Sequence, residues 1–111
     1  MKIKETKLGL VSILALVGPL IEEHLDLLKE RLDHCIDSGN LRVLIDLKEV
    51  SIIDSAGLEL LWDSLMKFRK DSGSLKLVNA NPLIMDIFLA TRMTNIFEIF
   101  SDQEKAYRSS I

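Results

Sequence analysis

Ser55 is the residue whose type and setting best suit a chemical event. It stands in the stretch SIIDSAGLEL, residues 51–60, where a short apolar run ends and a helical pattern begins. A serine directly before a helix is most often an N-cap, because its oxygen accepts a hydrogen bond from a free N–H group of the first turn. The same position also favours an anion, because those N–H groups give a helix N-terminus a partial positive charge. A cap and a phosphorylation site are therefore both open.

A phosphate on Ser55 would change what the surrounding loop can bind. It would add about -1.5 to -2 charges and three strong hydrogen-bond acceptors, and the neighbouring Asp54 would make the site still more negative. The helix end can carry this dianion without unfolding the domain, so the effect would fall on a docked protein. Gly57 indicates either a tight backbone or a close partner, since glycine costs about 1 kcal/mol inside a helix. The pattern predicts a protein-binding switch.

Alternating strands and helices are expected to position this segment. The predicted elements are strands 2–6 and 8–17, helix 20–36, strand 41–47, helix 58–68, strand 75–79, helix 82–91, short strand 96–100 and a helix from 101. This order predicts an α/β fold, a mixed and mostly parallel sheet of about four to five strands packed with about four helices. Sites in such sheets lie at the carboxyl ends of strands, where residues 49–57 are expected.

Local signals fix parts of this pattern. Strand 41–47 has apolar residues on one face and Leu44 on the other, which predicts a strand covered on both sides. Asn81 followed by Pro82 is typical of an N-cap and the first turn of a helix. The sequence S-x-x-E at 101–104 matches a capping box, so the last helix is expected to have Ser101 as its cap.

Length, charge and cysteine content limit the function. The 111 residues suit one domain, residues 1–111, and a net charge of -3 without a basic cluster gives no support to nucleic-acid binding. Residues 8–20 are too few to span a bilayer and do not resemble a signal peptide, so no membrane association and a cytoplasmic location are expected. Cys35 is the only cysteine and is expected to be a buried apolar residue, which excludes an intramolecular disulfide.

Catalysis and bound cofactors are not expected. The sequence has no phosphate-binding loop and no nucleophile elbow, and Ser55 has no evident base. His24 and His34 are ten residues apart and do not share a helix face as metal ligands would, so no metal site is predicted. The sequence therefore favours a binding protein over an enzyme.

The segment VLIDLKEVSIIDSAGLELL, residues 43–61, resembles the signature of the STAS domain, and the order of elements agrees along essentially the whole chain. The resemblance is greatest to free-standing bacterial anti-sigma factor antagonists. It implies that Ser55 is the phosphoacceptor. The unphosphorylated form would bind an anti-sigma factor that is also a serine kinase, and so free a sigma factor, and a serine phosphatase would reset the switch. The implied monomer or weak dimer would bind its partner through Asp54, Ser55, Ala56, Gly57, Leu58, Glu59 and Leu60.

Two departures from the family pattern leave an alternative open. Gly18 is present, but the sequence VGPLIEEH lacks the acid pair that many members carry there, and Glu59 occupies a position that is often glycine. Some STAS proteins serve instead as constitutive subunits of signalling or lipid-transport complexes. In that case Ser55 would act only as an N-cap.

The sequence also predicts the surroundings of three apolar residues in the helix at 58–68. Leu60 lies on the polar side of the helical wheel, so it is either an isolated exposed leucine or a partner contact. Trp62 and Met66 lie at the edge of the apolar stripe, which favours the core over a partner contact, although a half-exposed Trp62 would suit such a contact.

Overall fold

The computed structural model describes all 111 residues and contains a single five-stranded sheet in the order β1-β2-β3-β4-β5. The first strand pairs antiparallel with the second, and every other neighbouring pair is parallel. The strands are β1 (Lys2–Leu8), β2 (Val11–Val17), β3 (Arg42–Glu49), β4 (Ser74–Val78) and β5 (Ile99–Phe100). The helices are α1 (Asp26–Asp37), α2 (Ser55–Lys70), α3 (Pro82–Ala90) and α4 (Gln103–Ser110), with 3-10 turns η1 (Glu22–His24) and η2 (Met93–Asn95). The predicted mixed α/β fold is confirmed.

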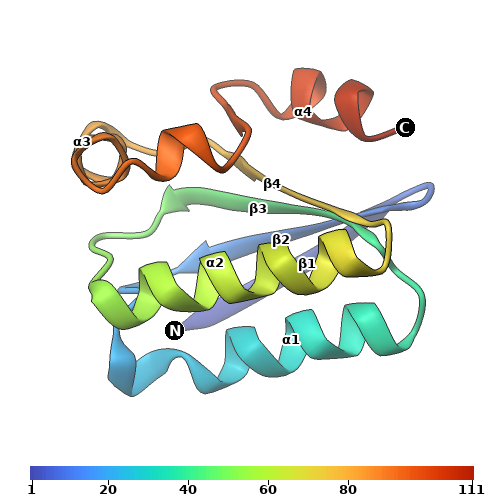
Figure 1. Ribbon diagram of the computed structural model, residues 1–111, viewed down its shortest axis with the longest axis horizontal. Helices are drawn as coiled ribbons and strands as arrows, with labels where there is room; N and C mark the ends of the chain where they lie inside the picture. The colour runs from blue at the N-terminus through green and yellow to red at the C-terminus, as the bar shows by residue number, and fades with distance from the viewer.

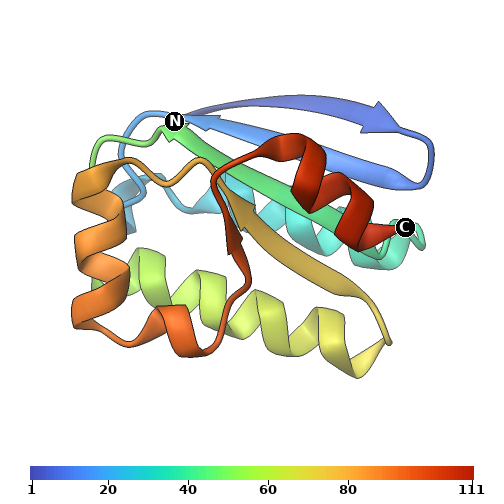
Figure 2. The ribbon, with the colours of Figure 1, turned by 90° about the horizontal axis from the view of Figure 1, so that it is seen from above.

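The sheet separates two layers of unequal size. Figure 1 shows α1 and α2 below the sheet and α4 above it, and Figure 2 shows α4 lying across β3 and β4. The face covered by α1, α2 and α3 carries a cluster of 20 buried apolar residues, whereas the face under α4 carries five. Ile45 belongs to the first cluster and Leu44 to the second, so the prediction that this strand is covered on both sides is confirmed.

Two predicted boundaries near the N-terminus were wrong. Gly9 and Leu10 form the turn between β1 and β2, with Gly9 at φ +59°, so they do not belong to a strand. The first α-helix begins at Asp26 and not at Leu20, because the Leu20 backbone bonds to another loop. Its N–H donates to the Ile52 carbonyl at 2.9 Å.

The predicted caps had different outcomes. Asn81 caps α3, with its side-chain oxygen accepting from the Ile84 N–H at 3.0 Å, and Pro82 follows in the first turn as predicted. The capping box at residues 101–104 is wrong. Asp102 is the N-cap of α4, because its carboxylate accepts from the Glu104 N–H at 2.8 Å.

A buried lysine joins α4 to the sheet. Lys76 on β4 is only 8% exposed, and its ammonium donates to the Ser109 carbonyl at 2.8 Å and to the Ser109 hydroxyl. It also pairs with Glu98 at 3.5 Å and lies 5.8 Å from the centre of the Phe100 ring. These contacts hold the last turn of α4 over the smaller apolar cluster.

The single cysteine lies inside the larger core. Cys35 on α1 is 1% exposed, which confirms the prediction, and burial raises the pKa of its thiol. No helix is both long enough and apolar enough to span a lipid bilayer.

Candidate functional site: a surface around Ser55

Ser55 is the first residue of α2 and is exposed to solvent. The helix begins just after the carboxyl end of β3, close to the end of β2 (Figure 1), as the sequence predicts for a site in a parallel sheet. Because α2 is 16 residues long, the partial positive charge at its first turn is well developed.

Asp54, and not Ser55, is the N-cap of α2. One oxygen of its carboxylate, Oδ1, accepts from the Gly57 N–H at 2.8 Å, and Oδ2 accepts from the Glu22 N–H at 3.0 Å. The hydrogen bonds from Gly57 and then from Glu22 lower the pKa of Asp54 below its usual value. The interpretation of Ser55 as a cap is therefore corrected, and its hydroxyl is not needed to begin the helix.

Backbone contacts join the two loops at this end of the sheet. The Gly18 N–H donates to the Glu49 carbonyl at 3.0 Å, and the Asp54 N–H donates to the Leu20 carbonyl at 3.3 Å. Gly18 has φ +113°, a conformation that a residue with a side chain rarely adopts, so glycine is required there. Together with the hydrogen bond that the Glu22 N–H donates to the Asp54 carboxylate, these contacts hold η1 beside the first turn of α2.

Gly57 is buried and contacts its own chain. A Cβ atom at this position would overlap the Leu20 carbonyl oxygen and would come within 3.1 Å of the Ile53 side chain. Of the two explanations suggested by the sequence, the structure supports the tight backbone. Gly57 therefore shapes the surface from beneath, and its contact with a partner stays a prediction.

The remaining predicted partner-binding residues divide into two groups. Leu58 is half-buried and packs against the larger core. Ala56, Glu59 and Leu60 line a groove of about 580 Å³ between α1 and α2. Leu60 is half-buried on the wall of this groove, so the interpretation of an isolated exposed leucine is wrong.

The expectation that Trp62 and Met66 belong to the core had different outcomes for the two residues. Trp62 is 40% exposed and so is not a core residue. Met66 is half-buried, packs against the core and lines the groove with Leu60.

Sequence reasoning missed several acidic residues of this surface. Glu22, Asp26 and Asp63 line the same groove from η1, α1 and α2. A usable signal was present, because Glu59 and Asp63 lie four residues apart on one helix, and such like-charged pairs are unfavourable. The approach of η1 to α2 had no such signal, because it depends on backbone bonds between loops.

Three comparisons place this geometry among known proteins. The family model described as STAS domain matches residues 2–106. BtrV of Bordetella bronchiseptica, which is named as an anti-sigma factor antagonist, is 27% identical over 96% of this chain and 91% of its own length. The crystal structure of TM1081 from Thermotoga maritima, described in the same way, has a TM-score of 0.92 at 22% identity and covers 97% of this chain and 93% of its own.

The anti-sigma factor antagonist SpoIIAA has the same fold. Its unphosphorylated form has a TM-score of 0.74 at 16% identity and covers 97% of this chain and 96% of its own. The phosphorylated form of SpoIIAA from Bacillus has the same TM-score at 15% identity, with 97% and 99% coverage.

Proposed function

The chain belongs to the STAS domain family, and we propose that it is an anti-sigma factor antagonist switched by phosphorylation of Ser55. Its unphosphorylated form binds an anti-sigma factor that is also a serine kinase, and a sigma factor is released. A serine phosphatase restores the binding form, and the cycle takes place in the cytoplasm. The docking surface comprises Ser55, the exposed Glu59 and the half-buried Ala56 and Leu60, held in place by Asp54 and Gly57.

The observation that carries this proposal is that Ser55 is exposed at a helix start that another residue caps. Asp54 accepts the Gly57 N–H, so the Ser55 hydroxyl is not committed to the fold. A kinase can therefore reach the hydroxyl without first unfolding α2. The helix N-terminus then stabilises the phosphate that results.

The phosphate acts at the contact with the kinase. In the transfer, the Ser55 oxygen bonds to the γ-phosphorus of ATP, the bond to ADP breaks, and the hydroxyl proton passes to a base on the kinase. The new dianion then faces the remaining phosphates of the nucleotide and stands beside Asp54. Repulsion and the loss of hydration at this contact separate the two proteins.

The similar proteins support both parts of the proposal. BtrV and TM1081 are named as anti-sigma factor antagonists and resemble this chain over nearly its full length. SpoIIAA is known in phosphorylated and unphosphorylated forms with this fold.

The first test is the intact mass of the protein purified from its own cells, before and after phosphatase treatment. We expect one phosphate, removed by the phosphatase and mapped to Ser55 by fragmentation. Ser51→Ala is the matched control, because Ser51 is also exposed and lies four residues earlier, in the loop that leads into α2, and this variant should keep the phosphate. A chain that is unmodified in both growth and stress would contradict the switch and support the constitutive scaffold subunit.

Two substitutions separate the switch from the scaffold. Ser55→Ala should keep kinase binding but accept no phosphate, whereas Ser55→Asp should bind weakly in a pull-down with the purified kinase. Because Asp54 supplies the cap, Ser55→Ala should leave the free energy of unfolding nearly unchanged. Equal binding by both variants would overturn the switch.

A further inference from the structure

The groove between α1 and α2 begins beside Ser55 and runs between these two helices. Ala56 and Glu59, one and four residues after Ser55, line it from α2, and Leu25 and Asp26 line it from the start of α1. The groove has a volume of about 580 Å³ and is open to solvent. A partner bound at Ser55 therefore reaches this groove without crossing another element.

The groove has an apolar wall that the core does not fully cover. Leu25, Leu60 and Met66 are half-buried, and each packs against the larger core while it also lines the groove. An apolar side chain inserted between the two helices would remove the remaining surface of these residues from water, which favours binding.

The charge around this apolar wall is strongly unbalanced. The half of the groove near Ser55 is lined by four carboxylates and a single ammonium group. The ammonium belongs to Lys29, and the carboxylates belong to Glu22, Asp26, Glu59 and Asp63. None of these four carboxylates belongs to an ion pair of the structure. Lys67 pairs with Asp33 across the two helices at 3.5 Å, and this ion pair marks the end of the acidic half of the groove.

We infer that this groove binds a basic amphipathic segment of the partner protein. Apolar side chains of the segment pack on Leu25 and Leu60, and its lysines and arginines face the four carboxylates. Docking of an amphipathic helix into a groove between helices is a common mode of recognition. The inference rests on the proposed function, because the groove continues from Ser55 and so belongs to the same docking surface.

The test uses the full chain and a defined probe. The probe is a leucine–lysine amphipathic peptide about five turns long, and a leucine–glutamate peptide of the same length is its control. In NMR titrations of the ¹⁵N-labelled protein, we expect the lysine peptide to shift the amides of Asp26, Lys29 and Asp63. The affinity should fall with added salt, since screening is strong beyond about 8 Å at physiological ionic strength. An equal response to the glutamate peptide, or no shift in the groove, would overturn the inference.

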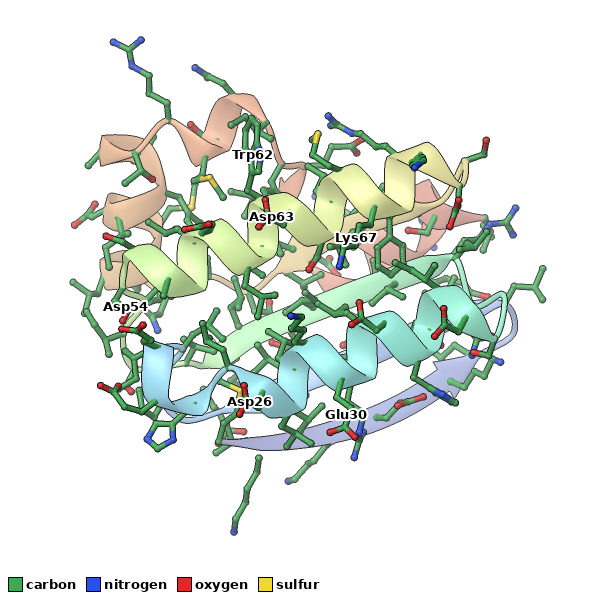
Figure 3. All side chains as sticks on the ribbon, turned by 60° about the horizontal axis from the view of Figure 1, so that its bottom comes forward. Asp26, Glu30, Asp54, Trp62, Asp63 and Lys67 are labelled. Atoms are coloured by element: carbon green, nitrogen blue, oxygen red, sulfur yellow. The ribbon has the colours of Figure 1, made fainter.

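A pair of matched variants tests the charge itself. Asp63→Asn should weaken binding of the lysine peptide about threefold, the size expected for one partly exposed ion pair. Glu30→Gln removes the same charge from α1, but Glu30 lies on the side of α1 towards β1 and does not line the groove (Figure 3), so it should leave the affinity unchanged. Equal losses in the two variants would show that only net charge matters and would contradict a specific groove.

The groove and the switch can fail separately. Ser55→Ala should bind the lysine peptide as the unmodified protein does, because its hydroxyl does not line the groove. Absence of peptide binding would overturn the groove and leave the phosphorylation test intact. An unphosphorylated Ser55 in cells would overturn the switch while peptide binding remained.

Discussion

The two faces of the sheet are covered in different ways. On one face, α1, α2 and α3 enclose 20 buried apolar residues, and the loops beside Ser55 are joined by close backbone contacts. On the other face, the short helix α4 covers a cluster of five and is held by the buried ammonium of Lys76. Apolar packing therefore dominates the first face, whereas the second combines a smaller apolar cluster with the polar contacts of a single lysine.

This difference explains where a binding switch can be placed. The loops at Ser55 rest on the larger core, so the phosphate that we propose there would be added and removed while the fold remained intact. The second face has much less apolar area to compensate for a lost contact. A comparable change of charge at Lys76 would weaken the hold on α4, and the smaller face is therefore a poor position for reversible modification.

The largest effect is expected from Gly57→Ala on the larger face. Replacement of glycine by alanine normally stabilises a helix, but here the new methyl group would overlap the Leu20 carbonyl oxygen. We expect the free energy of unfolding to fall by about 3 kcal/mol, as for an overpacked core. Urea denaturation followed by circular dichroism measures this change.

Ala56→Gly is the control for Gly57→Ala, because it lies one residue earlier in the same turn and tests helix propensity alone. It should cost about 0.5–1 kcal/mol. If Gly57→Ala raised the stability by a similar amount, the close contact between α2 and the loop after β2 would be wrong. The larger face would then be less tightly joined than we describe.

A smaller and more local effect is expected from Lys76→Met on the second face. Methionine fills similar space but cannot bond to the Ser109 carbonyl, so α4 should open more often. Hydrogen exchange should become at least about tenfold faster for the last turn of α4, since a bond from a charged donor contributes about 1.5–3 kcal/mol. The amides of α2 should keep their protection.

Lys70→Met is the control for Lys76→Met, because Lys70 is exposed at the end of α2 and makes no ion pair. It should leave the exchange of α4 unchanged. If the hydrogen exchange of α4 were also unchanged in Lys76→Met, apolar packing alone would hold the helices on both faces. That result would contradict the difference between the two faces.

Periodicity predicted the elements well but not the contacts between loops. Apolar residues on both faces, with Leu44 opposite the others, identified β3 as covered on both sides, and Asn81 with Pro82 marked the start of α3. The start of α1 was placed too early, because Leu20 continues the apolar pattern of a helix but bonds to the Ile52 carbonyl. A single sequence carries no direct signal for such a long-range backbone bond.

The site was predicted in position but not in the roles of its residues. Asp54 and Ser55 are adjacent and both are good N-caps, so sequence alone could not decide which one begins the helix. In the structure the Gly57 N–H bonds to the Asp54 carboxylate, which also accepts from the Glu22 N–H, 32 residues away. The groove was missed for a related reason, because its acidic residues come from separate elements.

The smallest effect, and the most selective, is the pH dependence of the Asp54 contact. The pKa of Asp54 is lower in the folded chain than in the unfolded chain, because the Gly57 and Glu22 N–H groups stabilise the carboxylate. Its contribution to stability is therefore fully present above about pH 4, the unfolded value, and is lost as the pH falls through the lower folded value. Asp54→Asn should be less stable than the unmodified protein at neutral pH, and the difference should narrow in acid.

Urea midpoints measured between about pH 2 and pH 7 would follow the Asp54→Asn difference through the range where the carboxylate titrates. Asp63→Asn is the control, because the Asp63 carboxylate accepts no backbone hydrogen bond. A difference for Asp54→Asn that stayed constant down to the lowest pH would assign the loss to the amide geometry, not to the charge. The expected narrowing would show that the charge of one carboxylate holds η1 to α2, while the larger core keeps both elements folded when that charge is lost. Lys76, on the other face of the sheet, has only the smaller apolar cluster beside it.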